Sequence, residues 1–197
     1  MQKYKINAHI LKNYDDELSA LKDSVVKMGT MSLTALEKSV KGLVDGDRDL
    51  CYDVIDEDEF IDQQEKNIDE QGMSILLRFN PVASDLRHVL SSLNICRSLE
   101  RIGDHAVTVA KRSRKILKQG PLEEIRLVDP LYLEARKIVS AALTAYSDVD
   151  ETLALSVLKM YREVDKILKA HGKSIRAKIS EGTGQNRLVY TDCDCAQ

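Results

Sequence analysis

The segment Leu99-Glu100-Arg101-Ile102-Gly103-Asp104-His105 lies inside a long stretch whose apolar residues recur at helical spacing. A second acidic pair with the same spacing of four, Asp58 and Asp62, lies inside an earlier apolar-periodic stretch. Residues four apart share one face of an α-helix, so each pair presents two carboxylates that point the same way. The sequence therefore predicts long helices that each carry a patch of negative charge.

Apolar periodicity extends from these pairs into three long amphipathic helices. We expect the first over residues 10–44, the second over residues 47–78 and the third over residues 81–117. Asp47 follows an Asp-Gly turn and is placed to cap the second helix. Asn80-Pro81 suggests a cap followed by proline at the first position of the third. Long helices joined by short turns lie antiparallel, so the sequence predicts an elongated three-helix bundle.

The rest of the chain contains two shorter helical patterns, one over residues 129–146 and the other over residues 151–179. Three long helices followed by two shorter ones suggest an internal duplication whose second copy lacks its last helix. We therefore expect a first bundle over residues 1–119, a partial second repeat over residues 120–181 and an irregular tail over residues 182–197. The inward stripe predicted for the last helix is Leu155, Leu158, Val164, Ile167 and Leu168.

The two shorter helices have apolar faces that this partial repeat would leave poorly covered. Large exposed apolar patches are rare on monomers. We therefore expect the first bundle or a partner chain to cover these faces.

The composition favours an all-α protein and argues against several functions. The 197 residues include 43% hydrophobic and 31% charged residues, but only 3 prolines and no tryptophan. This mixture is typical of helices, and a net charge of −3 gives no basic field for nucleic acid. No apolar run resembles a signal peptide or reaches the ~20 residues of a membrane span, so we expect a cytoplasmic protein.

The cysteine pattern fits the same compartment, where thiols stay reduced. Cys51 and Cys96 fall within apolar-periodic segments and are expected in or near the core. Cys193-x-Cys195 has the spacing of a metal or redox pair but lacks a second pair or a nearby histidine. We therefore expect the latter two to be ordinary residues of the tail.

The acidic pairs are predicted to meet at one height of the bundle. Asp58 and Asp62 lie 22 and 18 residues before Asn80, and Glu100 and Asp104 lie 20 and 24 residues after it. An antiparallel turn near Asn80 brings the pairs together, and like charges that close repel unless a cation lies between them. Oxygen ligands suit Mg²⁺, Ca²⁺ or Mn²⁺, and iron or zinc in carboxylate clusters. The predicted metal ligands are Asp58, Asp62, Glu65, Glu100 and Asp104.

Simpler interpretations of this charge stay open. A run of acidic residues on a helix is often only a solvated face. Arg87, Arg97 and Arg101 either pair with the acidic stripe or orient its carboxylates and contact a partner. His105 follows Asp104 and is either a ligand or a plain surface histidine.

Motifs of the common enzyme classes are absent. The sequence contains no phosphate-binding P-loop, no dinucleotide fingerprint, no serine nucleophile elbow and no zinc protease motif. The Glu-x-x-His motif of di-iron bundles is also missing here, because His105 lies five residues after Glu100. The pattern favours binding over catalysis.

Two motifs together resemble the PhoU family of phosphate-transport regulators. One is Asn80-Pro81-Val82-Ala83-Ser84-Asp85-Leu86-Arg87, and the other is the stretch of residues 99–105 quoted above. Asp58, Asp62 and Glu65 stand where that family carries the acidic motif of its second helix. Residues 18–31 resemble its first helix, and the whole resemblance covers roughly residues 5 to 180.

The resemblance implies tandem three-helix bundles that are often dimeric and bind clusters of metal ions through acidic motifs. It also implies a regulator without enzymatic activity that restrains the phosphate-starvation response when phosphate is plentiful. Its partners would be the ATPase subunit of the Pst phosphate ABC transporter and a PhoR-type sensor kinase. Asp85, Arg87, Arg101 and His105 would support the start of the third helix, orient the metal ligands or contact a partner.

The second half departs from the family pattern. Asp165 stands where Asp62 stands in the first repeat, but Tyr161 and Leu168 replace the flanking acids, and the second Glu-Arg-Ile-Gly-Asp helix is missing. We therefore predict one metal site, with iron, zinc, manganese or magnesium as candidate ions. Three alternatives stay open, namely an accessory of another phosphate permease, a degenerate paralogue that pairs with a complete relative, and a carboxylate-metal hydrolase or storage bundle.

Overall fold

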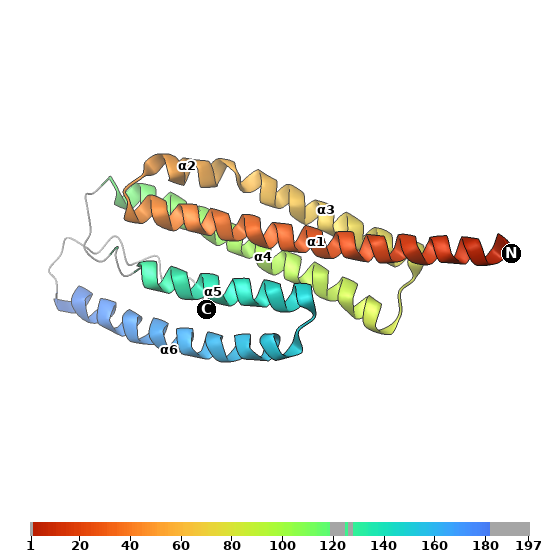
Figure 1. Ribbon diagram of the computed structural model, residues 1–197. Helices are drawn as coiled ribbons and strands as arrows, with labels where there is room; N and C mark the ends of the chain where they lie inside the picture. The colour runs from red at the N-terminus through yellow and green to blue at the C-terminus, as the bar shows by residue number, and fades with distance from the viewer. Residues whose placement is uncertain (1, 119–124, 126–127, 182–197) are drawn as a thin grey trace.

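The chain folds into long antiparallel helices, as the sequence predicts, and the described residues contain no strand. The computed structural model describes residues 2–118, 125 and 128–181. Figure 1 shows the helices side by side, with the N-terminal end of α1 extending past the other helices. Their bounds are α1 Gln2–Val44, α2 Arg48–Asp56, α3 Asp58–Phe79, α4 Ala83–Ile116, α5 Val128–Asp148 and α6 Glu151–Glu181.

The first four helices form the predicted three-helix bundle, because α2 and α3 together occupy the place of one helix. α1 and α4 pack along most of their length, and α3 packs against both. Their shared core is mainly apolar and buries both cysteines of this region completely. The core includes Leu21, Val25, Met28, Cys51, Ile68, Ile75, Val89 and Cys96.

The second helix is interrupted, which the sequence did not indicate. α2 ends at Asp56 and α3 begins at Asp58, with Glu57 between them. The backbone N–H of Glu57 donates to the carbonyl of Asp53, and its carboxylate pairs with Lys38 of α1 at 2.6 Å. No proline or glycine lies there, and the apolar periodicity continues across the break, so the sequence pattern does not reveal it.

The turn between α3 and α4 also differs from the prediction. Asp47 caps α2 as expected, and its carboxylate accepts hydrogen bonds from two backbone N–H groups. Asn80, however, ends α3 in the left-handed conformation with φ 48° and ψ 57°, and α4 begins only at Ala83 after an extended Val82. Asparagine tolerates this conformation, which lets it terminate a helix as glycine does. Pro81 therefore lies in the turn and is not the first helical residue.

The first bundle covers the apolar face of α5. The sequence left two possibilities for this face, the first bundle or a partner chain. Leu143 lies against α1 at Gly29, and the hydroxyl of Tyr146 lies 2.7 Å from the hydroxyl of Ser92 in α4. The ring of Tyr146 also stacks on that of His88. These contacts hold α5 against α1 and α4.

The inward stripe predicted for the last helix is wrong in its first half. Leu155 and Leu158 are 55% and 60% exposed. α6 packs on α5, where Ala154 and Val157 line the contact. A helix that touches one neighbour buries one narrow stripe, and the sequence pattern does not say which of its apolar rows that is.

Several expectations lie outside the described part of the chain. They concern the helix stop at residues 119–121, most of the linker at residues 122–128, and the tail with Cys193 and Cys195. The division into domains stays a prediction. No helix in the described residues has the length and apolarity needed to cross a membrane.

The contact between Gly29 and Leu143 predicts how α5 is held. A Cβ at Gly29 would lie 2.5 and 2.6 Å from the two Cδ atoms of Leu143. We expect Gly29→Ala to lower the free energy of unfolding by about 1 kcal/mol, because overpacking outweighs the gain in helix propensity. Thermal unfolding and hydrogen exchange of α5 measure the effect.

The control removes the clash. In the Leu143→Ala background, Gly29→Ala should be neutral or stabilising, since the space is then free. If Gly29→Ala changed stability equally in both backgrounds, the close contact would not hold α5.

Candidate functional site: the acidic face of α3 and α4

Two glycines let α3 and α4 approach closely beside the acidic pairs. A Cβ at Gly103 would lie 3.0 Å from Cδ1 of Ile61 and 3.9 Å from Oδ1 of Asp58. A Cβ at Gly72 would lie 2.7 Å from Cδ2 of Leu93. The antiparallel register predicted from the sequence is therefore confirmed, and Asp58 lies beside the turn of α4 that carries Asp104.

Each of the five predicted ligands lies close enough to at least one other for their charges to interact. Burial raises the pKa of Asp58, and the charges of Asp62 and Asp104 raise it further, while Lys111 lowers it. Burial likewise raises the pKa of Glu100. Hydrogen bonding and charge from Asp104, and the charges of Glu65 and Asp62, act in the same direction. The carboxylates therefore repel one another across the α3–α4 contact.

The side chains do not yet form a closed coordination shell. Within the described residues, no three histidine, cysteine, aspartate or glutamate side chains converge as a metal ion requires. Asp62 and Asp104 are exposed and can rotate, whereas Asp58 and Glu65 are half-buried. The all-oxygen donor set and its mutual repulsion fit a hard cation, so the metal ligands stay a prediction that this surface supports.

Cys96 lies beneath the acidic face and belongs to the core. Its thiol donates a hydrogen bond to Sδ of Met28 at 3.4 Å. Burial, followed by the charges of Glu65 and Asp69, raises the pKa of Cys96 to about 12. The thiol therefore stays protonated, and the expectation of a core cysteine is confirmed; the same holds for buried Cys51.

The other residues singled out in the sequence lie apart from this cluster or point to solvent. Asp85 accepts a hydrogen bond from the hydroxyl of Tyr14 at 3.0 Å, which ties α1 to the start of α4. Burial and the Asp85 carboxylate raise the pKa of Tyr14 to about 12. Arg87, Arg101 and His105 are exposed on α4. Asp85 thus has the supporting role expected of it, and the sequence held no signal for its partner Tyr14.

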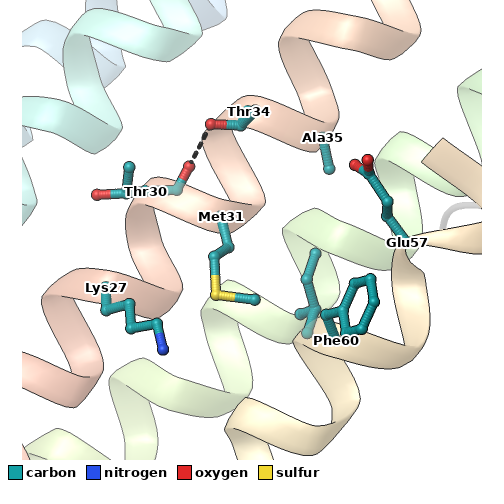
Figure 2. A pocket seen from close by; sticks show the side chains of 8 residues that line it. Lys27, Thr30, Met31, Thr34, Ala35, Glu57 and Phe60 are labelled. Carbon is teal, nitrogen blue, oxygen red and sulfur yellow. Dashed lines mark hydrogen bonds between the residues drawn. The ribbon is translucent and has the colours of Figure 1, made fainter. Parts of the chain in front are cut away.

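A separate groove lies between α1 and the start of α3, beside the helix break at Glu57. Figure 2 shows Met31 and Phe60 facing it, with Glu57 at its rim. Its volume is about 460 Å³, and its lining is mostly apolar. The hydroxyl of Thr34 donates to the carbonyl of Thr30 on its own helix. Glu57 at the rim is already paired with Lys38.

Comparison with known proteins gives one consistent family. The PhoU domain matches residues 25–113 of the chain. A phosphate-specific transport system accessory protein PhoU homologue of Xylella fastidiosa is 36% identical over 164 residues, which are 83% of this chain and 66% of that protein. The homologue from Pseudomonas aeruginosa is 34% identical over 173 residues, covering 86% of this chain and 70% of that protein. The chain thus spans about two thirds of the length of these curated relatives.

Solved structures agree with the sequence comparison. The crystal structure of PhoU from Pseudomonas aeruginosa matches with a TM-score of 0.81 at 32% identity, covering 85% of this chain and 81% of that one. A phosphate transport system regulatory protein PhoU from Streptococcus pneumoniae matches with a TM-score of 0.79 at 24% identity, which supports the fold alone.

The repulsion within the acidic face predicts a pH dependence for the metal-free protein. Folding raises the pKa of Glu100 above its ordinary value of 4.5 and that of Asp58 above 3.8. Their protonated forms therefore stabilise the fold fully below those ordinary values, and this stability is lost as the pH rises through the raised values. In chelator, Glu100→Gln should raise the free energy of unfolding at pH 7 by about 0.5 kcal/mol and leave it unchanged near pH 4.

Thermal melts across this pH range measure the effect, and Glu70→Gln on the exposed face of α3 is the matched control. A Glu100→Gln protein that is less stable at pH 7 than the parent would mean that the carboxylate gains more from partners than it loses by repulsion.

Proposed function

The chain belongs to the PhoU family, and on this premise we propose that it is an accessory protein of phosphate transport. The observation that carries the proposal is the match to the Pseudomonas aeruginosa homologue, which is more than 30% identical over most of both chains. The same organism's PhoU crystal structure also has this fold. Sequence and fold thus agree over the same part of the chain.

In this proposal the protein acts by binding and has no enzymatic activity. It restrains phosphate uptake and the phosphate-starvation response when phosphate is plentiful. It does so in the cytoplasm by linking the ATPase subunit of the Pst phosphate ABC transporter to a PhoR-type sensor kinase. A rigid helical bundle with faces on several sides suits an adaptor of this kind, because it presents side chains at fixed positions to more than one partner.

The second part of the proposal concerns metal. We propose that Asp58, Asp62, Glu65, Glu100 and Asp104 hold one or more cations, with iron, zinc, manganese and magnesium as candidates. The support is the mutual repulsion of these carboxylates, which a cation would relieve while fixing α3 against α4. Gly103 lets Ile61 pack directly on α4, and this close approach would let both helices contribute oxygen atoms to the same ion.

A second candidate is an accessory of a phosphate permease that has no kinase link. The names of the curated relatives support this candidate, because they specify a phosphate transport system and mention no kinase.

The regulatory role predicts a phenotype. In a host that lacks this gene and grows in ample phosphate, we expect high alkaline phosphatase activity, because the starvation response is no longer restrained. Restoring the gene should return the activity to the low level of the parent strain. Low activity in both strains, with altered uptake of labelled phosphate, would instead support the permease accessory.

The metal site predicts a loss of binding on removing charge from both helices. Asp62→Asn with Asp104→Asn should lower Mn²⁺ binding measured by calorimetry, because each helix loses one oxygen ligand with full charge. Saturating Mn²⁺ at 100 times its dissociation constant should stabilise the parent by about 2.7 kcal/mol and the double variant by much less.

Glu70→Gln with Asp53→Asn is the matched control, since it removes two exposed carboxylates outside the cluster. Equal Mn²⁺ binding by the parent and by the Asp62 and Asp104 double variant would show that the ligands lie elsewhere.

A further inference from the structure

The groove between α1 and the start of α3 is a hollow with a mainly apolar lining. Its volume of about 460 Å³ lies within the range of small-molecule sites. Among its lining residues, Ala35 and Ile61 are buried and Met31 is half-buried, whereas Phe60 is 64% exposed. A ligand in the groove would remove the apolar surface of these side chains from water, which favours binding. The flexible thioether of Met31 can adapt to the shape of such a ligand.

The two threonines of the lining already use their hydrogen-bond donors within α1. The hydroxyl of Thr30 donates to the carbonyl of Val26 at 3.1 Å, and that of Thr34 donates to the carbonyl of Thr30 at 2.8 Å (Figure 2). A hydroxyl carries a single hydrogen, so neither side chain offers a donor to a ligand. The orientation of a ligand must therefore come from the charged residues of the groove.

Two charged side chains line the groove, and only one of them is available. Glu57 is neutralised by Lys38, whose ammonium lies 2.7 and 2.6 Å from its two carboxylate oxygens. Lys27 is exposed and forms no hydrogen bond or ion pair within the described residues. Lys27 and Lys38 are separated by roughly 16 Å of α1, at 1.5 Å per residue. The groove thus has an available cation toward one end and a closed ion pair toward the other, with Met31 between them (Figure 2).

The carboxylates nearest in the sequence lie outside this lining. Asp23 is one turn before Lys27 on α1, and Glu59 precedes Phe60 on α3, but neither lines the groove. Further along α3, Gln64 is uncharged, and its amide donates to a backbone carbonyl of α1 at 3.2 Å. The charge within the groove therefore favours a ligand with one negative charge.

A ligand that matches this lining has an apolar body and one carboxylate at its end. Its carbon atoms would cover Met31 and Phe60, while its charged end would lie at exposed Lys27 and keep part of its hydration. A cationic ligand would be repelled by the ammonium of Lys27. A compact and strongly hydrated anion such as inorganic phosphate would leave the apolar lining in water.

We propose that the groove between α1 and α3 binds a small amphipathic monocarboxylate. Its hydrocarbon body lies against Met31, Phe60 and Ile61, and its carboxylate pairs with the ammonium of Lys27. This inference rests on the groove alone and stands whether or not the protein serves phosphate transport.

The test uses decanoate, a carboxylate with a chain of about ten carbons, and the whole chain in chelator. Methionine methyl groups labelled with ¹³C report the site by nuclear magnetic resonance, because Met31 lines the groove and Met73 is an exposed methionine elsewhere on α3. Below the concentration at which decanoate forms micelles, we expect a saturable shift of the Met31 resonance and no shift of the Met73 resonance. Met31→Leu and Met73→Leu assign the two resonances.

Two variants test the apolar contact and the charge separately. Phe60→Ala should weaken decanoate binding by about tenfold, because the ligand loses a large apolar contact. Lys27→Glu should reverse the preference for charge, so that decylammonium binds more tightly than decanoate, whereas the parent prefers decanoate. Both residues are exposed, so both variants should keep the fold.

Matched controls are Leu158→Ala, which truncates a leucine that is 60% exposed on α6, and Lys41→Glu, which reverses an exposed charge near the end of α1. Unchanged decanoate binding by these two variants would support the proposal. It would be overturned if Met31 did not shift, if Met31 and Met73 shifted equally, or if Phe60→Ala or Lys27→Glu bound decanoate as the parent does. A parent dimer that Phe60→Ala converts to a monomer in sedimentation velocity would also overturn it, because a second copy would then occupy the groove.

Discussion

The close packing of α3 against α4 is the constraint on which the acidic face of this protein depends. Gly72 and Gly103 leave no Cβ between the helices, so Leu93 and Ile61 lie directly against the opposite backbone. The carboxylates of both helices are then held at one height, although their charges oppose this. The buried contacts of the bundle offset that repulsion, while burial and then the neighbouring negative charges raise the pKa values of Asp58 and Glu100.

The contact between α3 and α4 also separates the buried core from the acidic surface. On its inner side lie Cys96 and Met28, which are fully buried, and on its outer side lie the acidic residues. The thiol at the boundary stays protonated because neighbouring negative charge and burial both oppose its ionisation. A cation on the outer side would act on the two helices that form the core, so its binding would stabilise the whole bundle.

The second half of the chain is attached in a different way. α5 is held by the close packing of Leu143 on Gly29 and by the hydrogen bond between the hydroxyls of Tyr146 and Ser92. α6 has α5 as its main neighbour and keeps Leu155 and Leu158 largely exposed. We therefore expect local stability to decrease from the first bundle through α5 to α6, since contacts with the core decrease in the same order.

The sequence by itself determined the helices, their antiparallel order and the meeting of the two acidic pairs. Periodicity of 3.6 residues and similar distances from the Asn80 turn can be read along the chain without knowing how the helices pack. The break at Glu57, the start of α4 at Ala83, the partner of Asp85 and the buried row of α6 were decided by the tertiary structure. The hydrogen bond of Asp85 depends on Tyr14, and the buried row of α6 is the one that meets α5. No local pattern specifies which distant side chain will arrive.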